Sequence, residues 1–536
     1  MATATIIPAQ APSKPAINPW FIAVTVTIAA FMELLDTSIA NVALPYIGGG
    51  LGRSYDEVTW ILTTYLVANA VVLPMTAWLS RLLGRKTYYL LCVILFTISS
   101  LCCGLAPSLG LMLIFRVVQG VGGGGLAPVA QAILVDTFPP ARRAAAFALF
   151  TVVIVTAPAI GPVLGGWITD NYSWRWIFFI NVPVGLISLY LSNKLIHDPE
   201  VFTTERLTAK AEGRMSVDAT GIVLITLASG ALEVALDRGQ IEDWFASDFI
   251  VTMITIAVVG WIGTVLWELW VKEPIIDFRL LTNRNFAIAS ILFFVFGIGL
   301  FGTTTLIPQM LQSLYGYRAI DAGLILGPGA LVITLLAPVS AQFLQRGLVS
   351  AKTLVFFSLS FIALSMFVYS DMNLATNGGH YVWTRALQGV GYGLFLVPVN
   401  IIAYSSLRPD QNNKASSLTN LFRNWGGSFG IAFITTTVER RENLHQLNLG
   451  AHLGASSQTL QQTTQGALNR LMEHGLTSAD AIPASLGLVY QQLVRQSTFL
   501  AFMDCFRVIG WLTLTMIPLV FLIRKFRAGG EAPAGH

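Results

Sequence analysis

Apolar stretches separated by short polar segments run along most of the chain, from Trp20 to Ile523. Each stretch reaches the roughly 20 residues that a helix needs to cross a bilayer, and about fourteen of them can be distinguished. An even number of spans places both chain termini on the same side of the membrane. The pattern therefore predicts an all-α polytopic membrane protein with about 14 transmembrane helices.

Basic residues between the predicted spans lie mainly on one side of the membrane. The pairs Arg142–Arg143 and Arg524–Lys525 fall on this side, whereas the opposite segments hold only scattered basic residues such as Arg53. Cytoplasmic segments of membrane proteins carry the excess of lysine and arginine. Both termini are therefore expected in the cytoplasm.

The two halves of the chain share a repeated sequence motif. The stretch Phe115–Gly122 recurs as Thr384–Gly391, and both contain the pattern R-x-x-Q-G-V-G at the start of an apolar run. Internal repeats of this size are typical of secondary transporters, whose substrate path runs between the two halves near the middle of the membrane. We expect two six-helix pseudo-repeats with two further helices inserted between them.

This organisation predicts three regions. They are an N-terminal six-helix bundle at 1–194, a cytoplasmic linker with two inserted transmembrane helices at 195–275, and a C-terminal six-helix bundle at 276–536. The last region contains a long external segment, Glu439–Gln496, which is rich in Gln, Asn and Ser. It is either a mobile loop or a docking surface for another protein, with short amphipathic helices such as Leu460–Met472.

Composition narrows the function. The chain is 54% hydrophobic and 11% charged, compared with about 25% charged residues in soluble proteins. Its net charge of +4 does not indicate a nucleic-acid partner. The four cysteines lack metal-ligand spacing and the six histidines fall outside the predicted spans, so no metal site is expected. No phosphate-binding loop is present, and neither a cofactor nor ATP hydrolysis is expected.

Two carboxylates stand out within the first span. Asp36 lies in a long apolar run and Glu33 precedes it by three residues, so both side chains share one helix face. An ionisable group inside the membrane costs roughly 2.5 to 3.5 kcal/mol and usually binds an ion or a proton. Like charges at this spacing resist being ionised together, so at least one carboxyl should hold a proton. The pair predicts a proton-coupled carrier.

Arg116 is the expected partner of these carboxylates. Asp36 and Arg116 lie at similar distances from the outer ends of their helices, which places both roughly 10 to 14 Å deep. A buried arginine keeps its proton and must pair with a carboxylate, a carbonyl or water. A static ion pair that locks two helices is the alternative, but one arginine cannot balance both Asp36 and Glu33.

Two further clusters suggest helix packing or gating. Pro158, Gly161, Pro162 and Gly165 belong to a run in which small residues recur at every fourth position, which allows close helix packing and bending. An ion pair between Arg85 and Asp136 would join the cytoplasmic ends of two helices in one conformation and break in another. Charges that only set the topology are the alternative for this second cluster.

The substrate-binding cavity is expected to have an aromatic and polar lining. Its candidate residues are Phe301, Gln388, Tyr392 and Asn400. Fold alone does not identify the substrate.

Several motifs together resemble the major facilitator superfamily, and within it the fourteen-span EmrB/QacA drug:proton antiporters. The matching stretches are Leu35–Pro45, Arg116–Gly120, Gly161–Gly166, Trp174–Pro183, Leu236–Gly239, Asp243–Phe245 and Asn283–Phe286. The last three favour the EmrB branch. The resemblance covers nearly the whole chain.

The resemblance implies export of hydrophobic or amphipathic compounds against proton entry, with Asp36 as the proton site and Arg116 modulating it. It marks the stretch around Gly161 as a motif of antiporters. It also implies a location in the inner membrane, with a periplasmic adaptor protein and an outer-membrane channel as partners. This chain departs from the family's usual first loop motif at Ala77 and Ser80, and many relatives have an uncharged residue in place of Glu33.

Two other classes of function are alternatives to proton-coupled drug export. A proton-coupled importer, or an exporter dedicated to one metabolite or siderophore, would share this fold and differ in the direction of proton flux or in its substrate. A membrane enzyme or a non-transporting receptor is less favoured, because no catalytic cluster lies within the spans. We therefore expect a transporter and not an enzyme.

Overall fold

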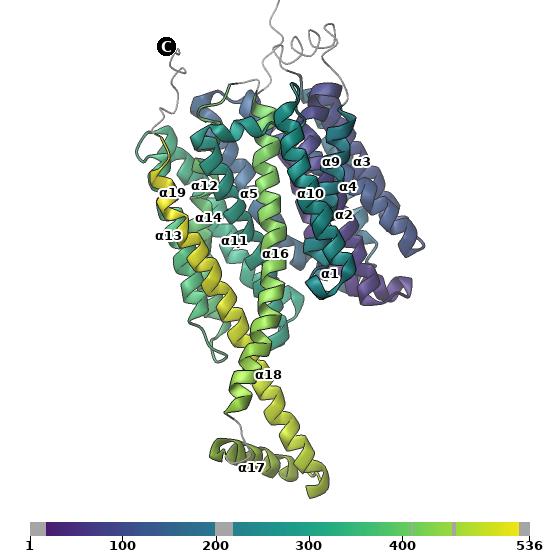
Figure 1. Cartoon of the computed structure of the whole chain (residues 1–536), viewed down its shortest axis with the longest axis vertical. Helices are drawn as coiled ribbons and strands as arrows, with labels where there is room; N and C mark the ends of the chain where they lie inside the picture. Colours follow the sequence, from purple (N-terminus) through teal and green to yellow (C-terminus); the bar gives the residue numbers. More distant parts are fainter. Residues whose placement is uncertain (1–17, 199–217, 409–410, 453–456, 525–536) are drawn as a thin grey trace, which may run out of the picture.

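A computed structural model describes residues 18–198, 218–408, 411–452 and 457–524, and within these ranges the chain contains helices and no strands. Thirteen of the helices are long and apolar enough to cross a membrane. The predicted fourteenth span corresponds to α16, which runs through the same bundle but is more polar than the others (Figure 1). Most of the predicted cytoplasmic linker, Leu195–Asp218, lies outside the described residues.

The first group of helices comprises α1 (Pro19–Leu51), α2 (Tyr55–Leu83), α3 (Arg85–Leu105), α4 (Leu109–Thr137), α5 (Arg143–Asn171), α6 (Trp176–Phe179) and α7 (Asn181–Leu195). The inserted pair is α9 (Ala219–Arg238) and α10 (Asp248–Trp270). The last group comprises α11 (Arg284–Tyr315), α12 (Ala319–Gln345), α13 (Ala351–Ser370), α14 (Gly378–Gly393), α15 (Leu396–Tyr404), α16 (Asn412–Ala451), α17 (Gln458–Glu473), α18 (Ser478–Thr515) and α19 (Ile517–Phe521). We call the first and last groups the N-half and the C-half.

Local sequence signals set the helix ends. At the start of α2 the Ser54 hydroxyl accepts a bond from the Glu57 backbone N–H at 3.4 Å, and the Glu57 carboxylate accepts one from the Ser54 N–H at 3.0 Å. This reciprocal arrangement satisfies two of the backbone donors that a helix start leaves unpaired. At the end of α1, Gly52 adopts a left-handed φ of 63°, a conformation that glycine reaches without a steric penalty.

Both ends of the described chain lie on the same face of the bundle. The Trp20 ring at the start of α1 packs against Phe138 at the end of α4, with ring centroids 5.1 Å apart. The backbone N–H of Arg524, which follows α19, donates to Asn285 at the start of α11 (2.9 Å). We call this side the terminus face and the opposite side, from which α16 and α18 project, the stalk face (Figure 1).

The two halves meet along α5 with α12 and along α2 with α16. A Cβ atom at Gly323 of α12 would come within 2.6 Å of the Val163 side chain in α5, so a larger residue would require the two helices or Val163 to shift. Near the terminus face, the Ser417 hydroxyl donates to the Leu73 carbonyl at 2.9 Å and the Asn412 amide donates to Asp136 at 2.6 Å. These bonds close the bundle on that face.

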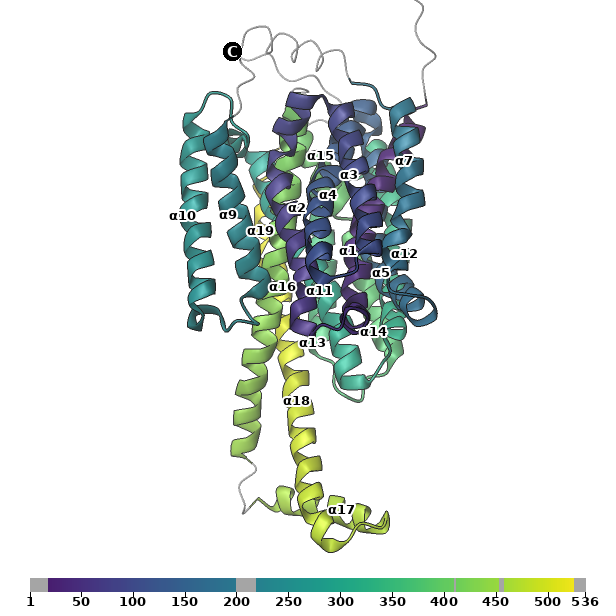
Figure 2. The same ribbon diagram turned by 90° about the vertical axis from the view of Figure 1, so that its right-hand side faces the viewer.

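The inserted pair covers one side of this boundary. Helix α9 packs on α2 and also contacts α16, while α10 lies outside it (Figure 2). Asp237 of α9 accepts a hydrogen bond from Thr63 of α2. Glu233, one turn earlier, accepts a bond from Ser428 of α16 at 2.9 Å. Helix α9 therefore makes side-chain bonds to both halves.

The segment Glu439–Gln496 forms a helical stalk. Helices α16 and α18 continue well beyond the other helices, and α17 lies at their tip (Figures 1 and 2). The expectation of a mobile loop is wrong for most of the segment, whereas the expected helix at Leu460–Met472 lies within α17. The Arg441 guanidinium donates to Asp504 at 2.7 Å and Thr498 donates to Glu442 at 2.9 Å, which ties α16 to α18.

Candidate functional site

Helix α1 carries both predicted carboxylates into the interior of the N-half. Asp36 is 2% exposed and Glu33 is 7% exposed. Three residues on a helix correspond to slightly less than one turn, so the two side chains lie one above the other on the same side. Their surroundings nevertheless differ.

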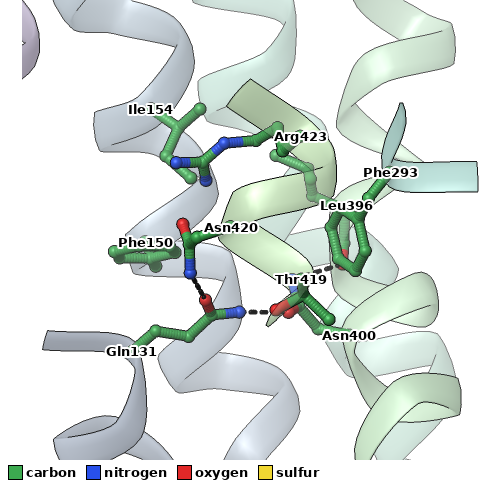
Figure 3. Close-up of a pocket in the computed structure, with 9 residues that line it drawn as sticks. All are labelled: Gln131, Phe150, Ile154, Phe293, Leu396, Asn400, Thr419, Asn420 and Arg423. Atoms are coloured by element: carbon green, nitrogen blue, oxygen red, sulfur yellow. Dashed lines mark hydrogen bonds between the residues drawn. The ribbon is translucent and has the colours of Figure 1, made fainter. Parts of the chain in front are cut away.

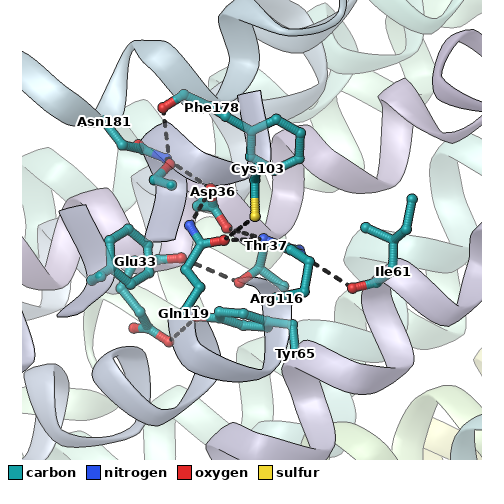
Figure 4. Close-up of polar contacts among 12 residues, drawn as sticks. Glu33, Asp36, Thr37, Ile61, Tyr65, Cys103, Arg116, Gln119, Phe178 and Asn181 are labelled. Atoms are coloured by element: carbon teal, nitrogen blue, oxygen red, sulfur yellow. Dashed lines mark hydrogen bonds and ion pairs between the residues drawn. The ribbon is translucent and has the colours of Figure 1, made fainter. Parts of the chain in front are cut away.

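Asp36 is held by donors from three positions on two other helices (Figure 4). Arg116 of α4 donates to Asp36 Oδ2 at 2.7 Å. Gln119 of α4 and Asn181 of α7 both donate to Oδ1, at 3.1 and 2.7 Å. Charge-assisted hydrogen bonds of this kind are shorter and stronger than those between neutral groups. The predicted pairing of Arg116 with Asp36 is thus present.

Arg116 is fully buried, and within the described residues its hydrogen-bond and ring partners all belong to the N-half. Its Nε donates to the Ile61 carbonyl at 3.1 Å and its Nη1 also donates to Gln119 at 2.9 Å. The guanidinium lies over the Tyr65 ring, 4.6 Å from the centroid, a geometry that attracts a cation to an aromatic face. Its Nη2 has no hydrogen-bond partner among the described residues.

Glu33 has weaker partners than Asp36. One carboxylate oxygen accepts bonds from the Tyr65 hydroxyl and the Asn69 amide, both at 3.3 Å. The other oxygen has no partner among the described residues. Arg116 forms an ion pair with Asp36 and none with Glu33. The expectation that Arg116 would serve both carboxylates therefore holds for Asp36 only.

A second polar site lies between the two halves (Figure 3). Gln131 of α4 donates to Asn400 of α15, and Asn420 of α16 donates to Gln131, both at 2.5 Å. The side chains that line this small cavity are Gln131, Phe150, Ile154, Phe293, Leu396, Asn400, Thr419, Asn420 and Arg423. Amides, aromatic rings and one cation thus face the same space at the boundary.

The four predicted substrate residues do not gather in one place. Asn400 lines the cavity between the halves. Gln388 and Tyr392 lie within the C-half, where the Gln388 amide donates to the Tyr392 hydroxyl at 3.2 Å. Phe301 of α11 packs close to Gly427 of α16.

The predicted gating residues occupy two places. Arg85 and Asp136 form an ion pair at the terminus face, where Asp136 also accepts a bond from Asn412 of the C-half. The strip on α5 packs against α1, because Gly161 lies beside Ser38 and Gly165 beside Ile39.

The same strip reaches both neighbouring helices. The Ser38 hydroxyl of α1 donates to the Pro158 carbonyl at 3.1 Å. Pro162 lies on the side of α5 that faces Gly323 of α12. These contacts are those of close helix packing, which was one of the two interpretations of the small-residue strip on α5.

Three important residues were not singled out from the sequence. Gln119 and Asn181 both donate to Asp36, and Arg423 lies in the cavity between the halves. The signal for Arg423 was a charged residue within a predicted span, which marks a functional position. The polar residues around it in α16 made that signal hard to see. No group of His, Cys, Asp or Glu in the described ranges could hold a metal ion.

The family model of the Major Facilitator Superfamily matches residues 26–431. The chain belongs to the major facilitator superfamily. It is 34% identical over 515 residues to the multidrug export protein EmrB of Escherichia coli (strain K12), covering 96% of this chain and 97% of that protein. It is 35% identical over 529 residues to the fatty acid resistance protein FarB of Neisseria gonorrhoeae, covering 98% of this chain and 99% of that protein.

Solved structures agree with this assignment. The proton:xylose symporter XylE has a TM-score of 0.57 over 94% of this chain and 99% of that chain, at 12% sequence identity. The human organic anion transporter MFSD10 has a TM-score of 0.53 at 11% identity, over 93% of this chain and all of that chain. At these identities the likeness concerns the fold alone. The predicted major facilitator fold and the resemblance to the EmrB branch of the superfamily are confirmed, and 13 of the 14 predicted spans are found among the described residues as helices long and apolar enough to cross a membrane.

Proposed function

We propose that this protein is a proton-coupled efflux transporter that exports hydrophobic and amphipathic compounds by alternating access. The observation that carries the proposal is the buried ion pair of Asp36 and Arg116, because a membrane-buried carboxylate usually serves an ion or a proton. The names of its relatives, multidrug export protein and fatty acid resistance protein, support the substrate class.

Protonation of Asp36 would change the forces within the N-half. As a carboxylate, Asp36 accepts bonds from Arg116, Gln119 and Asn181. A proton removes the negative charge, so the Arg116 cation loses its counter-charge and the three helices α1, α4 and α7 lose their strongest polar link. Glu33 would tune this step, because its charge lies one helical turn from Asp36.

The substrate would pass between the halves. In the present arrangement the terminus face is closed by bonds between the halves, including those of Ser417 with Leu73 and Asn412 with Asp136. Opening to that side must break these bonds and change the surroundings of the Arg85–Asp136 pair. Gating by Arg85 and Asp136, with bending of α5 at Pro158 and Pro162, belongs to this proposal.

We place the protein in the inner membrane with the terminus face in the cytoplasm. The excess of basic residues on that side supports this orientation. The stalk would then stand in the periplasm, where it exposes large apolar side chains such as Leu447 (73%), Ile482 (53%), Leu486 (51%) and Tyr490 (57%). Clustered apolar side chains on a surface mark interaction sites. We propose that a periplasmic adaptor, connected to an outer-membrane channel, docks there.

Transport by the purified protein tests the central proposal. The protein would be reconstituted in liposomes, and a fluorescent amphipathic dye such as ethidium would be followed after a proton gradient is imposed. We expect the dye to move opposite to the protons and the movement to stop when a protonophore collapses the gradient. Dye movement in the same direction as the protons, or none at all, would contradict the assignment as an exporter.

A further inference from the structure

The cavity between the halves contains a buried cation with few partners. Arg423 of α16 is 4% exposed and lines this cavity together with Gln131 and Asn420 (Figure 3). Its Nε has no hydrogen-bond partner among the described residues, and no described carboxylate forms an ion pair with it. Arginine does not lose its proton in proteins, so this position carries a positive charge.

The opposite charge that acts on Arg423 comes from the other half. Glu33 of α1 interacts electrostatically with Arg423 across the boundary, but the two groups form no ion pair. One oxygen of Glu33 also lacks a partner among the described residues. The charge of Arg423 is therefore only partly balanced, which is costly for a buried group unless a further anion completes the site.

Two other buried arginines, Arg116 and Arg385, differ in this respect. Arg116 pairs with Asp36 at 2.7 Å. Arg385 of α14 donates to Thr303 at 3.2 Å, to Thr304 at 3.4 Å and to Gln388. Both guanidinium groups thus have acceptors within their own half. Arg423 combines a cavity, an unpartnered donor and a location at the boundary.

We infer that Arg423 binds the anionic headgroup of an exported substrate, and that the site takes amphipathic anions such as carboxylates or sulfonates with an apolar body. This inference rests on the proposed export function and specifies one substrate class for it. The guanidinium presents a planar fork that fits two oxygen atoms of such a headgroup. The amides of Gln131 and Asn420 supply further polar contacts, and Phe150 and Phe293 supply apolar surface.

Binding would compete with interactions that now close the site. Gln131 is bonded to both Asn400 and Asn420, so these amides must separate to admit a ligand. A bound anion would also replace Glu33 as the counter-charge of Arg423. Arg423 would thereby couple substrate binding in the cavity to the charge of Glu33 on α1.

Binding of a matched pair of fluorescent ligands tests the inference. The ligands are 11-(dansylamino)undecanoate and its methyl ester, which differ in one negative charge. They would be titrated into the full-length protein in lipid nanodiscs at a pH at which the acid is ionised, with empty nanodiscs as the blank. The variants are Arg423→Gln, Arg423→Lys and Glu33→Gln, and Arg385→Gln is the matched control because it removes the same charge from the same half.

We expect Arg423→Gln to weaken binding of the acid about tenfold or more, the effect of losing a charge-assisted pair, and to change binding of the ester less than about twofold. Arg423→Lys should retain part of the affinity for the acid, and Arg385→Gln should retain all of it. Glu33→Gln should tighten binding of the acid because it removes the competing carboxylate. This gain tests the site even if Arg423→Gln fails to fold.

Equal affinity of wild type and Arg423→Gln for the acid would overturn the inference, as would equal losses for acid and ester or no gain in Glu33→Gln. Ethidium transport in liposomes by the same variants separates this inference from the proposed function. Ethidium is a cation, so its export by wild type and by Arg423→Gln should persist. If wild type exports ethidium while Arg423→Gln binds the acid normally, the anion site is wrong and the export function stands.

Discussion

The two halves contain the same arginine–glutamine pair in different electrostatic surroundings. In the N-half, Arg116 and Gln119 of α4 both donate to the carboxylate of Asp36. In the C-half, Arg385 and Gln388 of α14 both donate to the hydroxyl of Thr303 in α11. The repeated motif preserves the geometry of the donors, but among the described residues both donors meet a carboxylate only in the N-half.

This difference separates the roles of the halves. A carboxylate changes its charge when it binds a proton, whereas a threonine hydroxyl stays neutral. Proton binding can therefore alter the helix contacts of the N-half while those of Arg385 remain constant. The C-half has its own distinguishing feature, because α16 and α18 extend into the stalk whereas α5 and α7 are joined without one (Figure 2).

The largest effect is expected at Asp36. Asp36→Asn keeps the shape of the side chain but cannot bind and release a proton, so gradient-driven dye efflux in liposomes should fall to the background of empty liposomes. Thr303→Val is the matched change in the C-half and should retain most of the transport. Asp36→Asn leaves Arg116 without its counter-charge, so thermal unfolding would be measured to confirm that the variant is folded. Normal drug resistance in cells that carry Asp36→Asn would refute the coupling role.

The arginines provide the next comparison. Arg116→Ala leaves Asp36 buried without its cation, which costs about 3 to 5 kcal/mol if the carboxylate stays ionised. Arg116→Lys keeps the charge but loses the planar fork. Both variants should lose active efflux, the alanine variant more completely.

The matching variants Arg385→Ala and Arg385→Lys should be less impaired in transport, because no described carboxylate pairs with Arg385. Efflux rates and thermal unfolding of the four proteins would be measured side by side. Full activity of both Arg116 variants would make Arg116 a packing residue.

Removal of the stalk tests the other difference between the halves. A variant that joins α16 to α18 by a flexible linker near Glu439 and Gln496 should keep proton-driven transport in liposomes, where no partner is present. The same variant should lose drug resistance in intact cells with two membranes. Equal resistance with and without the stalk would contradict the docking proposal, and loss of liposome transport would place the stalk in the substrate path.

The smallest effect is expected for Glu33→Gln. Glu33→Gln removes a negative charge one helical turn from Asp36, and with it the repulsion between the two carboxylates. The pH at which efflux is half-maximal should therefore move to a lower value, by up to about one pH unit, which corresponds to about 1.4 kcal/mol. Transport itself should persist. An unchanged pH profile of efflux in liposomes would show that Glu33 does not influence the proton site.

The sequence predicted those features that depend on regular helix geometry. Asp36 and Arg116 were placed at equal depth because spans alternate in direction and rise by a constant length per residue, and their atoms lie 2.7 Å apart. The repeat R-x-x-Q-G-V-G predicted two related halves, and Arg385 indeed reaches Gln388 as Arg116 reaches Gln119.

Features that depend on packing between distant segments were harder to predict. Asn181 reaches Asp36 only because α7 returns beside α1, which no local pattern reveals. A mobile loop was one of two interpretations of the stalk segment, because the segment is long and polar. In the structure α16 and α18 pack side by side and are joined by bonds such as Arg441 with Asp504. The predicted division at 195 and 275 stays a prediction.

Helix α9 has a consequence for how compounds dissolved in the lipid leaflets reach the protein. Helix α9 accepts hydrogen bonds from Thr63 of α2 on one side and from Ser428 of α16 on the other. It therefore lies over the boundary between these two helices. A compound dissolved in the lipid that approaches the seam between α2 and α16 from this side would therefore meet α9 first.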